Sequence, residues 1–581
     1  MANFFEDNED IKFHLEHMDL GELAEIMEEG FRFADEFDHA PRNREDAVEN
    51  YRRVLSVVGE VAGGFIAERA EDVDLAGAHH NEDGTVSYAP GTADALKKLT
   101  QAEVMGFTLP HRFGGLNFPN LAYTMAIDMV SRADASLMNL FGLQGIAETI
   151  SAFASEEIKQ QYLPGFCSGE YTGAMALTEP DAGSDLQAVK VRAYQDETGQ
   201  WRVDGVKRFI TNGCGEILLV LARSEPETTD GRGLSMLLVE RNEHLRVRRI
   251  ENKLGIHGSP TCELVFDKCP ATLIGERQRG LVTYVMSLMN GARVGIAAQS
   301  LGLGEAAYRV ARDYASTRRQ FGLAIEQMPA VRDLLIDMSL ELQAARVLTY
   351  ETSRYVDRLY GASKRIELDP PSDKTELRDL RQDERRYKRL TGMLTPMTKY
   401  LASEMSVKVS SDAIQVLGGS GYMKDYPCER YFRDSRITTI YEGTSQLQVV
   451  AAVRGVMQGS VDRLLDELAA QDGSAETLGL RQQLERGQAD LNEAITFVKG
   501  QPGVEYMDLH GRKLVDAAID LIVGYLFLRD AHHSEAKAAA AKRWVTTRMP
   551  RARMLRELIE TGDRSTMTDF ELLAAPVAEQ E

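Results

Sequence analysis

Apolar positions follow a helical period over the first 165 residues and again from Gly280 onward, whereas the segment between them follows a period of two. The runs 19–27 and 48–67 carry apolar residues at i, i+3 and i+4, which is typical of amphipathic helices. Apolar-rich runs at 121–153 and 281–314 predict further, longer helices. Between 74 and 90 a segment rich in Gly, His and Asn interrupts the pattern and predicts a loop.

The middle of the chain, from about Gly169 to Pro270, alternates between apolar and polar residues and contains several turn sequences. This pattern is typical of an antiparallel β-barrel or sandwich of about 100 residues. The expected strands are 172–177, 189–193, 201–203, 217–222, 235–239 and 263–266.

The changes of period divide the 581 residues into four parts, as expected for a chain too long for one hydrophobic core. The expected fold class is a mostly α, multidomain α+β protein. The parts are an N-terminal helical domain (1–168), a central β domain (169–275), a C-terminal helical bundle (276–459) and a helical extension (460–581). We expect a charge-dense, exposed excursion between helices at 364–389, a linker at 466–479 and a frayed end over the last twenty residues.

The composition bears on partners and location. A formal net charge of -22 and a pI of about 5.1 argue against nucleic acid or an anionic membrane as the main partner. Five scattered cysteines without a CxxC pair indicate reduced thiols. The N-terminus lacks an apolar signal region, and the longest apolar run, 517–528, contains Asp520 and is far too short to span a membrane. We therefore expect a cytoplasmic protein without a membrane span.

Two stretches that look like binding motifs are expected to be ordinary parts of a helix and of a loop. Gly302-Leu303-Gly304-Glu305-Ala306-Ala307 fits a dinucleotide fingerprint, but it lies inside a helical pattern instead of following a strand. His79-His80 has no further ligands at zinc spacing nearby, so we expect an exposed loop and no metal site.

The segment 411–450 is the most informative stretch. It contains an apolar helix end, a Gly-Gly-Ser-Gly break and then Tyr441-Glu442-Gly443-Thr444 at the start of another helical run. A carboxylate before a glycine at such a junction can face a pocket, although most Glu residues are solvated. Two further stretches, 177–185 and 206–213, each end an expected strand, the first with groups that can hold an anion and the second with an aromatic and a hydroxyl that suit a flat heterocycle. Ordinary loops at a barrel rim remain the alternative for both.

Seven motifs occur in one order along the chain: LTEPDAGSD, RFITNG, LGIHGSPTCELVF, MNGARVGIAAQ, RRQFG, QVLGGSGY and IYEGTSQ. Together they resemble the acyl-CoA dehydrogenase family over roughly residues 106–453. The resemblance implies an FAD enzyme that desaturates an acyl-CoA thioester between Cα and Cβ, with hydride transfer to flavin N5 and electrons passed to an electron-transfer flavoprotein. The segment beyond about 460 resembles the extension of larger members, and we expect a soluble homodimer.

The resemblance also implies roles for individual residues. Glu442 matches the catalytic base. Residues at cofactor-binding positions of the family are Leu177, Thr178, Ser184, Phe209, Thr211, Arg318, Phe321, Gln415, Gly418, Gly419, Thr444 and Gln446. Of these, Arg318, Phe321, Gln415 and Gly419 are expected to bind the ADP half of FAD across a subunit interface. Residues at substrate-binding positions are Ser184, Asn290, Arg293 and Gly443.

Two departures from the family pattern matter. Some members carry the base just before the arginine that matches Arg293, but Ala292 stands there in this chain and cannot act as a base, which favours Glu442. Asn290 replaces the acidic residue of many relatives, so its contact with CoA is an open point. The alternatives are an acyl-CoA oxidase of the same fold, a flavin-fold protein that binds nucleic acid, which the acidic charge disfavours, and a helical scaffold.

Overall fold

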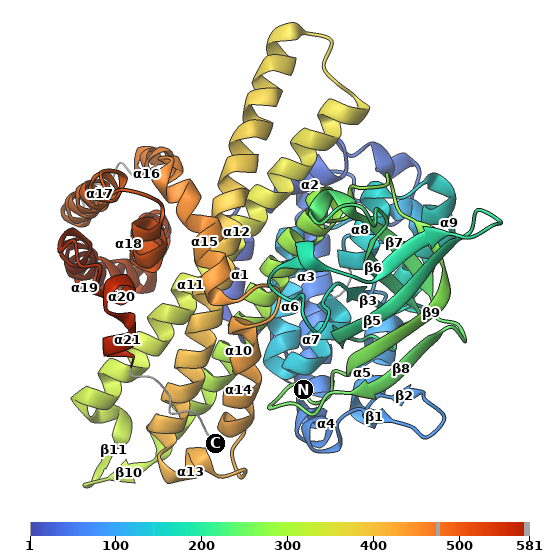
Figure 1. Ribbon diagram of the computed structural model, residues 1–581. Coiled ribbons are helices and arrows are strands. Elements are labelled where there is room, and N and C mark those ends of the chain that lie inside the picture. Colours follow the sequence, from blue (N-terminus) through green and yellow to red (C-terminus); the bar gives the residue numbers. More distant parts are fainter. Residues whose placement is uncertain (1, 143–144, 472–476, 575–581) are drawn as a thin grey trace. The chain divides into compact units, whose positions relative to one another are not determined.

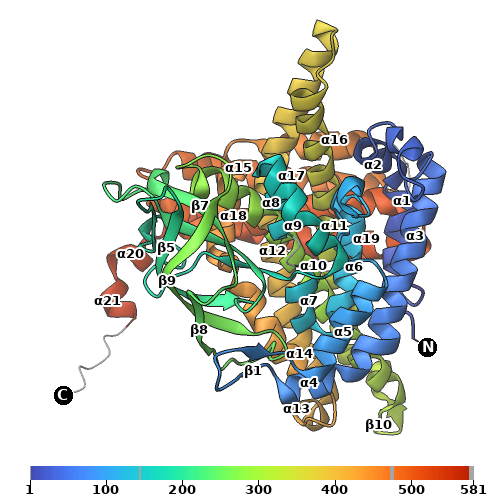
Figure 2. The same ribbon diagram turned by 90° about the vertical axis from the view of Figure 1, so that its right-hand side faces the viewer.

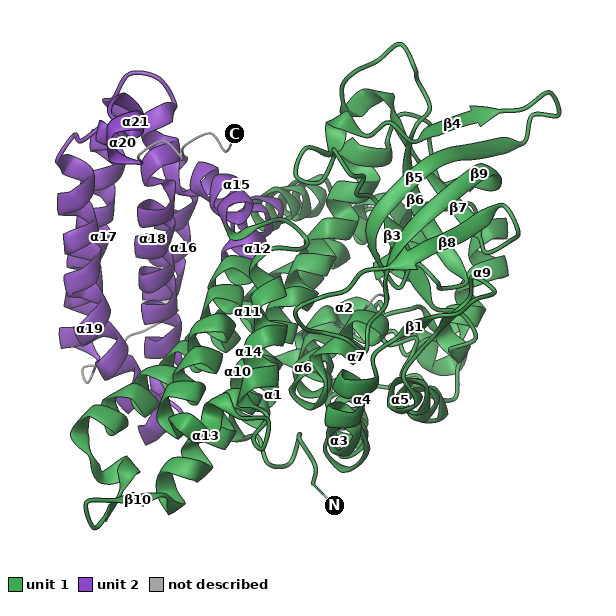
Figure 3. Ribbon diagram, turned by 60° about the horizontal axis from the view of Figure 1, so that its bottom comes forward, with its two compact units in different colours: residues 1–387, 398–445 green, residues 388–397, 446–581 purple. Residues whose placement is uncertain are grey.

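A computed structural model describes residues 2–142, 145–471 and 477–574 (Figure 1). The chain forms two compact units, one of residues 1–387 with 398–445 and one of residues 388–397 with 446–581 (Figure 3). Helices make up most of the described chain, and a sheet follows the N-terminal helices before the C-terminal helices begin. The expected fold class is therefore confirmed, while the bounds of the four expected domains stay a prediction.

In the described residues, the N-terminal part of the first unit consists mainly of nine α-helices. The expected helical run 121–153 is divided, because Asp134 has an extended backbone and its carboxylate accepts from the Ser136 N–H to start a new helix. The loop at 74–90 contains a two-strand hairpin, β1 (His79–His80) with β2 (Val86–Ser87). The helices are α1 (Glu9–His17), α2 (Leu20–Met27), α3 (Arg44–Val61), α4 (Ala70–Ala76), α5 (Pro90–Gln101), α6 (Asn120–Ala133), α7 (Ala135–Phe141), α8 (Gly145–Phe153) and α9 (Glu156–Ser168).

The seven strands of the central sheet are β3 (Gly173–Ala176), β4 (Arg192–Gln195), β5 (Trp201–Thr211), β6 (Ile217–Arg223), β7 (Leu234–Glu240), β8 (Leu245–Ile250) and β9 (Thr261–Leu273). They pair in the order β3-β6-β4-β5-β9-β7, with β8 on β9, and β6 also pairs with β7, so the path closes in a barrel-like way (Figure 2). The enclosed apolar residues include Val203, Leu218 and Phe266.

Three expectations for the sheet were wrong in detail. β3 runs parallel to β6, and β4 has one parallel pairing with β6, so the sheet is not purely antiparallel. Residues 189–191 precede β4 instead of opening it. β8 was not expected, because three arginines and a register shift between Val247 and Arg249 hide its alternation.

The remaining helices of the first unit begin after β9. They are α10 (Met286–Thr317), which continues a π-helical turn at Gly280–Val285, α11 (Pro329–Leu368), α12 (Lys374–Leu417), α13 (Gly419–Tyr422) and α14 (Cys428–Ser435), with a hairpin of β10 (Arg319–Gln320) and β11 (Leu323–Ala324) between α10 and α11. Among the described helices, Gly280–Thr317 is long and apolar enough to cross a membrane by length and composition. Residues 294–307 of this helix are buried in the protein, as in a core helix.

The supposed dinucleotide fingerprint lies within α10, as expected for a chance match. A Cβ atom on Gly302 would lie 2.4 Å from the carbonyl oxygen of Asp128 in α6. The first glycine of the pattern therefore permits close packing of two helices.

The charged insert at 364–389 is mostly exposed, as expected, but most of it belongs to α11 and α12 instead of lying between helices. Only 369–373 separate α11 from α12, and Pro370 explains the end of α11, because a residue before proline avoids the helical conformation. The turn lies at the tip of a hairpin that projects from the rest of the first unit (Figures 1 and 2).

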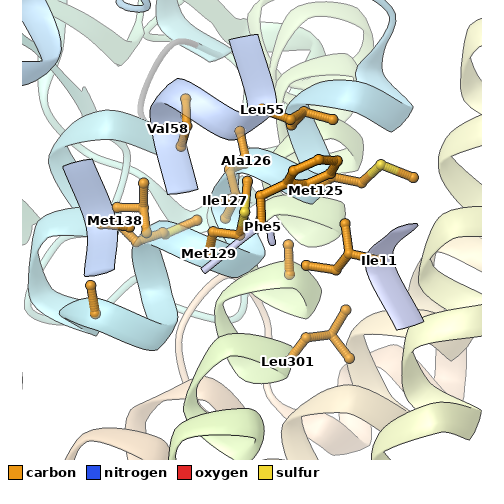
Figure 4. Packing of buried hydrophobic residues seen from close by; sticks show 14 of the residues in the cluster. Phe5, Ile11, Leu55, Val58, Met125, Ala126, Ile127, Met129, Met138 and Leu301 are labelled. Carbon is orange, nitrogen blue, oxygen red and sulfur yellow. The ribbon is translucent and has the colours of Figure 1, made fainter. Parts of the chain in front are cut away.

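The core of the first unit joins the N-terminal helices to α10 and α11. Figure 4 shows side chains from α1, α3, α6, α7 and α10 packed together, among them Ile11, Leu55, Met125 and Leu301. Beside this core the buried guanidinium of Arg346 pairs with Asp10, Asp128 and Glu305 at 2.8–3.0 Å. Burial of so many charges is tolerable because each has a partner of opposite sign.

The second unit consists of helices. They are α15 (Ser445–Met457), α16 (Ser460–Gln471), α17 (Leu478–Lys499), α18 (Glu505–Ala531), α19 (Glu535–Glu560), α20 (Ser565–Thr568) and α21 (Phe570–Leu573). Ser445, the first residue of α15, still belongs to the first unit. The expected linker at 466–479 begins too early, since α16 extends to Gln471. Residues 472–476 of the expected linker lie outside the described chain. α18 is buried throughout residues 517–528, and Arg551 of α19 pairs with its Asp516 and Asp520, both at 2.7 Å.

Candidate active site

Glu442 lies in a short turn between two helical segments and has a left-handed backbone, with φ at +54°. Gly443 follows at φ +90°, so two consecutive residues are left-handed. A glycine adopts this conformation freely, but a glutamate pays about 1–2 kcal/mol for it. Such strain persists only where surrounding contacts fix the backbone, and it is common at functional sites.

The residue before Glu442 fixes the turn to two helices. The Tyr441 hydroxyl donates to Oε1 of Gln299 in α10 and lies 3.2 Å from Oδ1 of Asn139 in α7. The Gln299 amide in turn donates to the Ala135 carbonyl at 2.8 Å and to Asn139 Oδ1 at 3.2 Å. Because these groups are buried and mutually bonded, they define where Glu442 sits.

Two cations modify the acidity of Glu442. Burial raises the pKa of its carboxyl, while Lys399 of α12 and Arg293 of α10 oppose that rise. The carboxylate in turn favours the charged forms of both cations, but burial lowers the pKa of Arg293 and brings the pKa of Lys399 to about 7. A carboxylate with a raised pKa is a better proton acceptor than a solvated one.

Arg293 and Asn290, two of the expected substrate residues, lie together on α10. The Nη1 atom of Arg293 donates to Oδ1 of Asn290 at 3.3 Å. Its Nε atom is buried and has no hydrogen-bond partner among the described residues, so a ligand oxygen there would satisfy it. Asn290 is exposed, and so is Ser184, which the structure does not connect to either residue by a described hydrogen bond.

Four of the residues expected to bind the cofactor form one patch: Leu177 and Thr178 directly follow β3, and Phe209 and Thr211 lie at the end of β5. The Arg208 N–H donates to the Thr178 carbonyl at 2.9 Å, which places Phe209 next to Thr178. Phe209 has φ +60° and a side chain that is 50% exposed, unusual for an aromatic residue in a strand. Leu177 is buried and Thr178 and Thr211 are half-buried, so the patch combines an apolar face with two hydroxyls.

A buried ion pair lies next to this patch and contacts the backbone of Leu177. Lys207 Nζ donates to Glu179 Oε1 at 2.9 Å and to the Leu177 carbonyl at 2.7 Å. The Glu179 carboxylate also accepts from the N–H groups of Lys190 and Val191. The loop after β3 is thereby held against β5.

A series of contacts joins the end of β5 to the Glu442 turn. The Asn212 N–H, directly after β5, donates to the Pro260 carbonyl at 2.8 Å. Ser259, the neighbour of Pro260, accepts from the Asn139 amide at 3.4 Å, and Asn139 contacts Tyr441. The strand that carries Phe209 and the turn that carries Glu442 therefore share one framework.

The residues expected at the ADP end of FAD lie at one exposed end of the first unit. Phe321, at the turn between β10 and β11, is 93% exposed, and Arg318 and Gln415 are exposed as well. The Tyr314 hydroxyl near the end of α10 is 3.5 Å from Ser420 Oγ, which brings this hairpin toward α13 (Figures 1 and 3). A Cβ atom on Gly418 or Gly419 would meet nothing within 4 Å, so the backbone is open to a ligand.

Thr444 and Gln446 were also expected to meet FAD. Thr444 directly follows Gly443 and is half-buried. Gln446 is exposed and belongs to the second unit. Their roles stay predictions.

Sequence reasoning missed four residues that hold the site: Asn139, Asn212, Gln299 and Lys399. Asn212 and Gln299 lie within quoted motifs, and a polar residue inside an apolar run is the signal that marks them. Lys399 has the same signal, since it is the charged residue in the run 393–400, all of which is buried in the structure.

Comparison with known proteins identifies the family. Its models match in order: "Acyl-CoA dehydrogenase, N-terminal domain" at 50–170, "middle domain" at 174–269, "C-terminal domain" at 279–368 and 379–457, and "Acyl-CoA dehydrogenase C terminal" at 457–557. The gap at 369–378 falls at the tip of the helical hairpin.

Individual known proteins and structures are also similar to this chain. An acyl-CoA dehydrogenase of Bacillus subtilis is 35% identical over 63% of this chain and 90% of its own length, and an acryloyl-CoA reductase (NADH) of Anaerotignum propionicum is 34% identical over 63% and 87%. A structure described as the electron transferring flavoprotein of Acidaminococcus fermentans superposes with a TM-score of 0.60 at 31% identity, covering 70% of this chain and 98% of its own. Caenorhabditis elegans ACDH-11 in complex with C11-CoA shares the fold over 100% of this chain and 96% of its own, with a TM-score of 0.78 at 18% identity.

The chain belongs to the acyl-CoA dehydrogenase family of oxidoreductases. FAD is the cofactor of this family. The residues present fit it, because Phe209 offers a half-exposed aromatic ring beside Thr178 and the glycines at 418 and 419 leave space against the backbone.

Proposed function

We propose that the protein removes hydrogen from Cα and Cβ of an acyl-CoA thioester, with Glu442 as the base that takes the α-proton. The observation that carries the proposal is the Glu442 turn: a strained backbone with a half-buried carboxylate that interacts with Arg293 and Lys399. A thioester α-proton is weakly acidic, so the reaction needs a base whose proton affinity is raised. Ala292, at the other family position for a base, has no group that can accept a proton.

The side chains of this protein would act by position and electrostatics. Entry of an acyl chain would displace water from the half-buried Glu442 and raise its proton affinity further. Arg293 would offer its unpartnered Nε–H to an oxygen of the substrate. Leu177, Thr178, Phe209 and Thr211 would hold the flavin ring, and FAD, when bound, supplies the acceptor for the hydride from Cβ.

The ADP end of FAD would be bound by Arg318, Phe321, Gln415, Gly418 and Gly419. Their exposure in the single chain supports a homodimer in which the partner subunit completes this part of the site. Ser184, Thr444 and Gln446 would make further cofactor contacts, with Ser184, Asn290 and Gly443 along the path of the substrate.

The electron acceptor we propose is an electron-transfer flavoprotein, and the location we propose is the cytoplasm. The match to a structure described by that name supports the acceptor, and five free cysteines support a reducing compartment. An oxidase is the second candidate. Hydrogen peroxide formed in proportion to substrate turnover would favour it over the dehydrogenase.

The test is an anaerobic titration of the purified, FAD-containing protein with acyl-CoA thioesters of different length and branching. We expect loss of flavin absorbance with at least one thioester and formation of the matching enoyl-CoA. Unchanged absorbance with the whole panel, in a preparation that retains FAD, would contradict the proposed activity.

A further inference from the structure

A fully buried lysine contacts the turn that carries Glu442. Lys399 lies on α12 and has no exposed surface. Its Nζ atom donates to the carbonyl oxygen of Gly443 at 2.8 Å. A buried ammonium group is costly unless neighbouring groups compensate it, so this lysine is expected to serve the groups that it touches.

The same helix holds the turn at a second point. Glu404, one and a half turns further along α12, accepts from the Ser445 hydroxyl at 2.6 Å. Tyr441 is held by Gln299 of α10. The anchored residues 441, 443 and 445 thus enclose Glu442, and the Lys399 bond acts on the second of the two left-handed residues.

The charges around Lys399 come from three elements. Glu442 of the turn and Glu404 of α12 favour its charged form, whereas Arg293 of α10 disfavours it. Lys399 in turn is the first of the cations that oppose the rise in the pKa of Glu442 caused by burial. One side chain therefore acts on both the backbone and the acidity of the candidate base.

We propose that Lys399 is a positioning residue for Glu442: it fixes the left-handed turn through the Gly443 carbonyl and sets the proton affinity of the carboxylate through its charge. This inference rests on the proposed function, in which Glu442 takes the α-proton. Lys399 itself touches neither substrate nor cofactor in this account.

The test compares Lys399→Met, which removes the donor and the charge, with Lys399→Arg, which keeps both. Lys408→Met is the matched control, because Lys408 lies on the same helix, is half-exposed and pairs with Asp412 at 3.1 Å. The readouts are FAD content, the acyl-CoA KM, and the rate of anaerobic flavin reduction as a function of pH.

For Lys399→Met we expect retained FAD, a KM within about threefold of wild type and a reduction rate about 10- to 100-fold lower, as for a misplaced catalytic group. On the acid side of the rate profile (the acid limb), the pH at which the rate falls to half should rise by about one unit, because Glu442 loses a neighbouring positive charge. Lys399→Arg should restore the position of the acid limb and part of the rate, and Lys408→Met should match wild type.

A wild-type rate and acid limb in Lys399→Met would overturn the inference. The inference would also be overturned if Lys399→Arg were as slow as Lys399→Met and both variants kept the acid limb of wild type. That result would indicate a structural role alone. If the Met variant does not fold, Lys399→Gln keeps a donor without the charge, and an unmoved limb there would also refute the inference. A Glu442→Gln variant that remains active would instead refute the proposed function.

Discussion

The backbone N–H of Asn212 donates to the carbonyl oxygen of Pro260 across 2.8 Å, and this bond joins the end of β5 to the loop that contacts Asn139. Asn212 is itself left-handed, with φ +51°. Its fully buried side chain donates to Thr172 Oγ1 and the Gly173 carbonyl and accepts from the Tyr88 hydroxyl. One residue thus holds three segments beside the expected flavin ring.

Asn212→Gly should weaken both the fold and FAD binding, since glycine keeps the left-handed backbone but removes the three side-chain hydrogen bonds. We expect a loss of about 1–3 kcal/mol in the free energy of unfolding. Tyr88→Phe removes only one of these bonds and should cost less. Denaturant titration and FAD retention after gel filtration measure both effects, and a Gly variant equal to wild type in both would contradict the assigned role.

The Lys207–Glu179 pair should be sensitive to loss of its cation. Burial lowers the pKa of Lys207 to about 8, with Glu179 opposing that shift. Lys207→Met leaves the Glu179 carboxylate buried without its cation, which should cost about 3–5 kcal/mol. Arg192→Met, which breaks a largely exposed pair with Asp204 on the same sheet, should cost far less stability than Lys207→Met. Equal losses in the two variants by denaturant titration would refute this ranking.

Asp357 should make stability depend on pH. Its buried carboxylate accepts from the N–H groups of Asn120 and Leu121 at the start of α6, yet burial raises its pKa from 3.8 to about 7. Because the folded state binds the proton more tightly, the contribution of Asp357 to stability is full below pH 4 and is lost as the pH rises to about 7.

Asp357→Asn keeps an acceptor oxygen and cannot ionise. Relative to wild type it should therefore flatten the fall in unfolding free energy between pH 4 and pH 7, measured by denaturant titration at several pH values. A difference between the two proteins that does not vary over this range would show that Asp357 does not titrate there.

We predict opposite effects on stability for Gly→Ala substitutions at Gly302 and Gly392. A Cβ atom on Gly302 would lie 2.4 Å from backbone atoms of α6, so Gly302→Ala should force two helices apart and cost about 1–3 kcal/mol. A Cβ atom on Gly392 would meet nothing within 4 Å, so Gly392→Ala in α12 should stabilise by about 0.5–1 kcal/mol. Thermal unfolding of both variants gives the sign of each effect, and a stable Gly302→Ala protein would argue against close packing there.

The order of helical and β parts could be predicted from the sequence, and Glu442 could be proposed as the base, but the residues that hold the Glu442 turn could not be predicted. The motif around Glu442 is contiguous, and the two periods separate helices from strands, so both are visible in a single sequence. Lys399 was missed because a lysine in a helix is usually solvated, and its contact with Gly443 joins residues 44 positions apart. β8 was missed because a bulge breaks its alternation, and the closed path of the sheet depends on pairings between distant strands.

Substitution of Glu442 by glutamine tests the central claim most directly, because Glu442→Gln keeps the size of the side chain and removes its ability to take a proton. The measurement is anaerobic flavin reduction by an acyl-CoA that reduces the wild-type protein, at matched FAD content. We predict that the variant retains FAD and binds the thioester but loses at least 100-fold in reduction rate. Reduction at the wild-type rate would show that Glu442 is not the base.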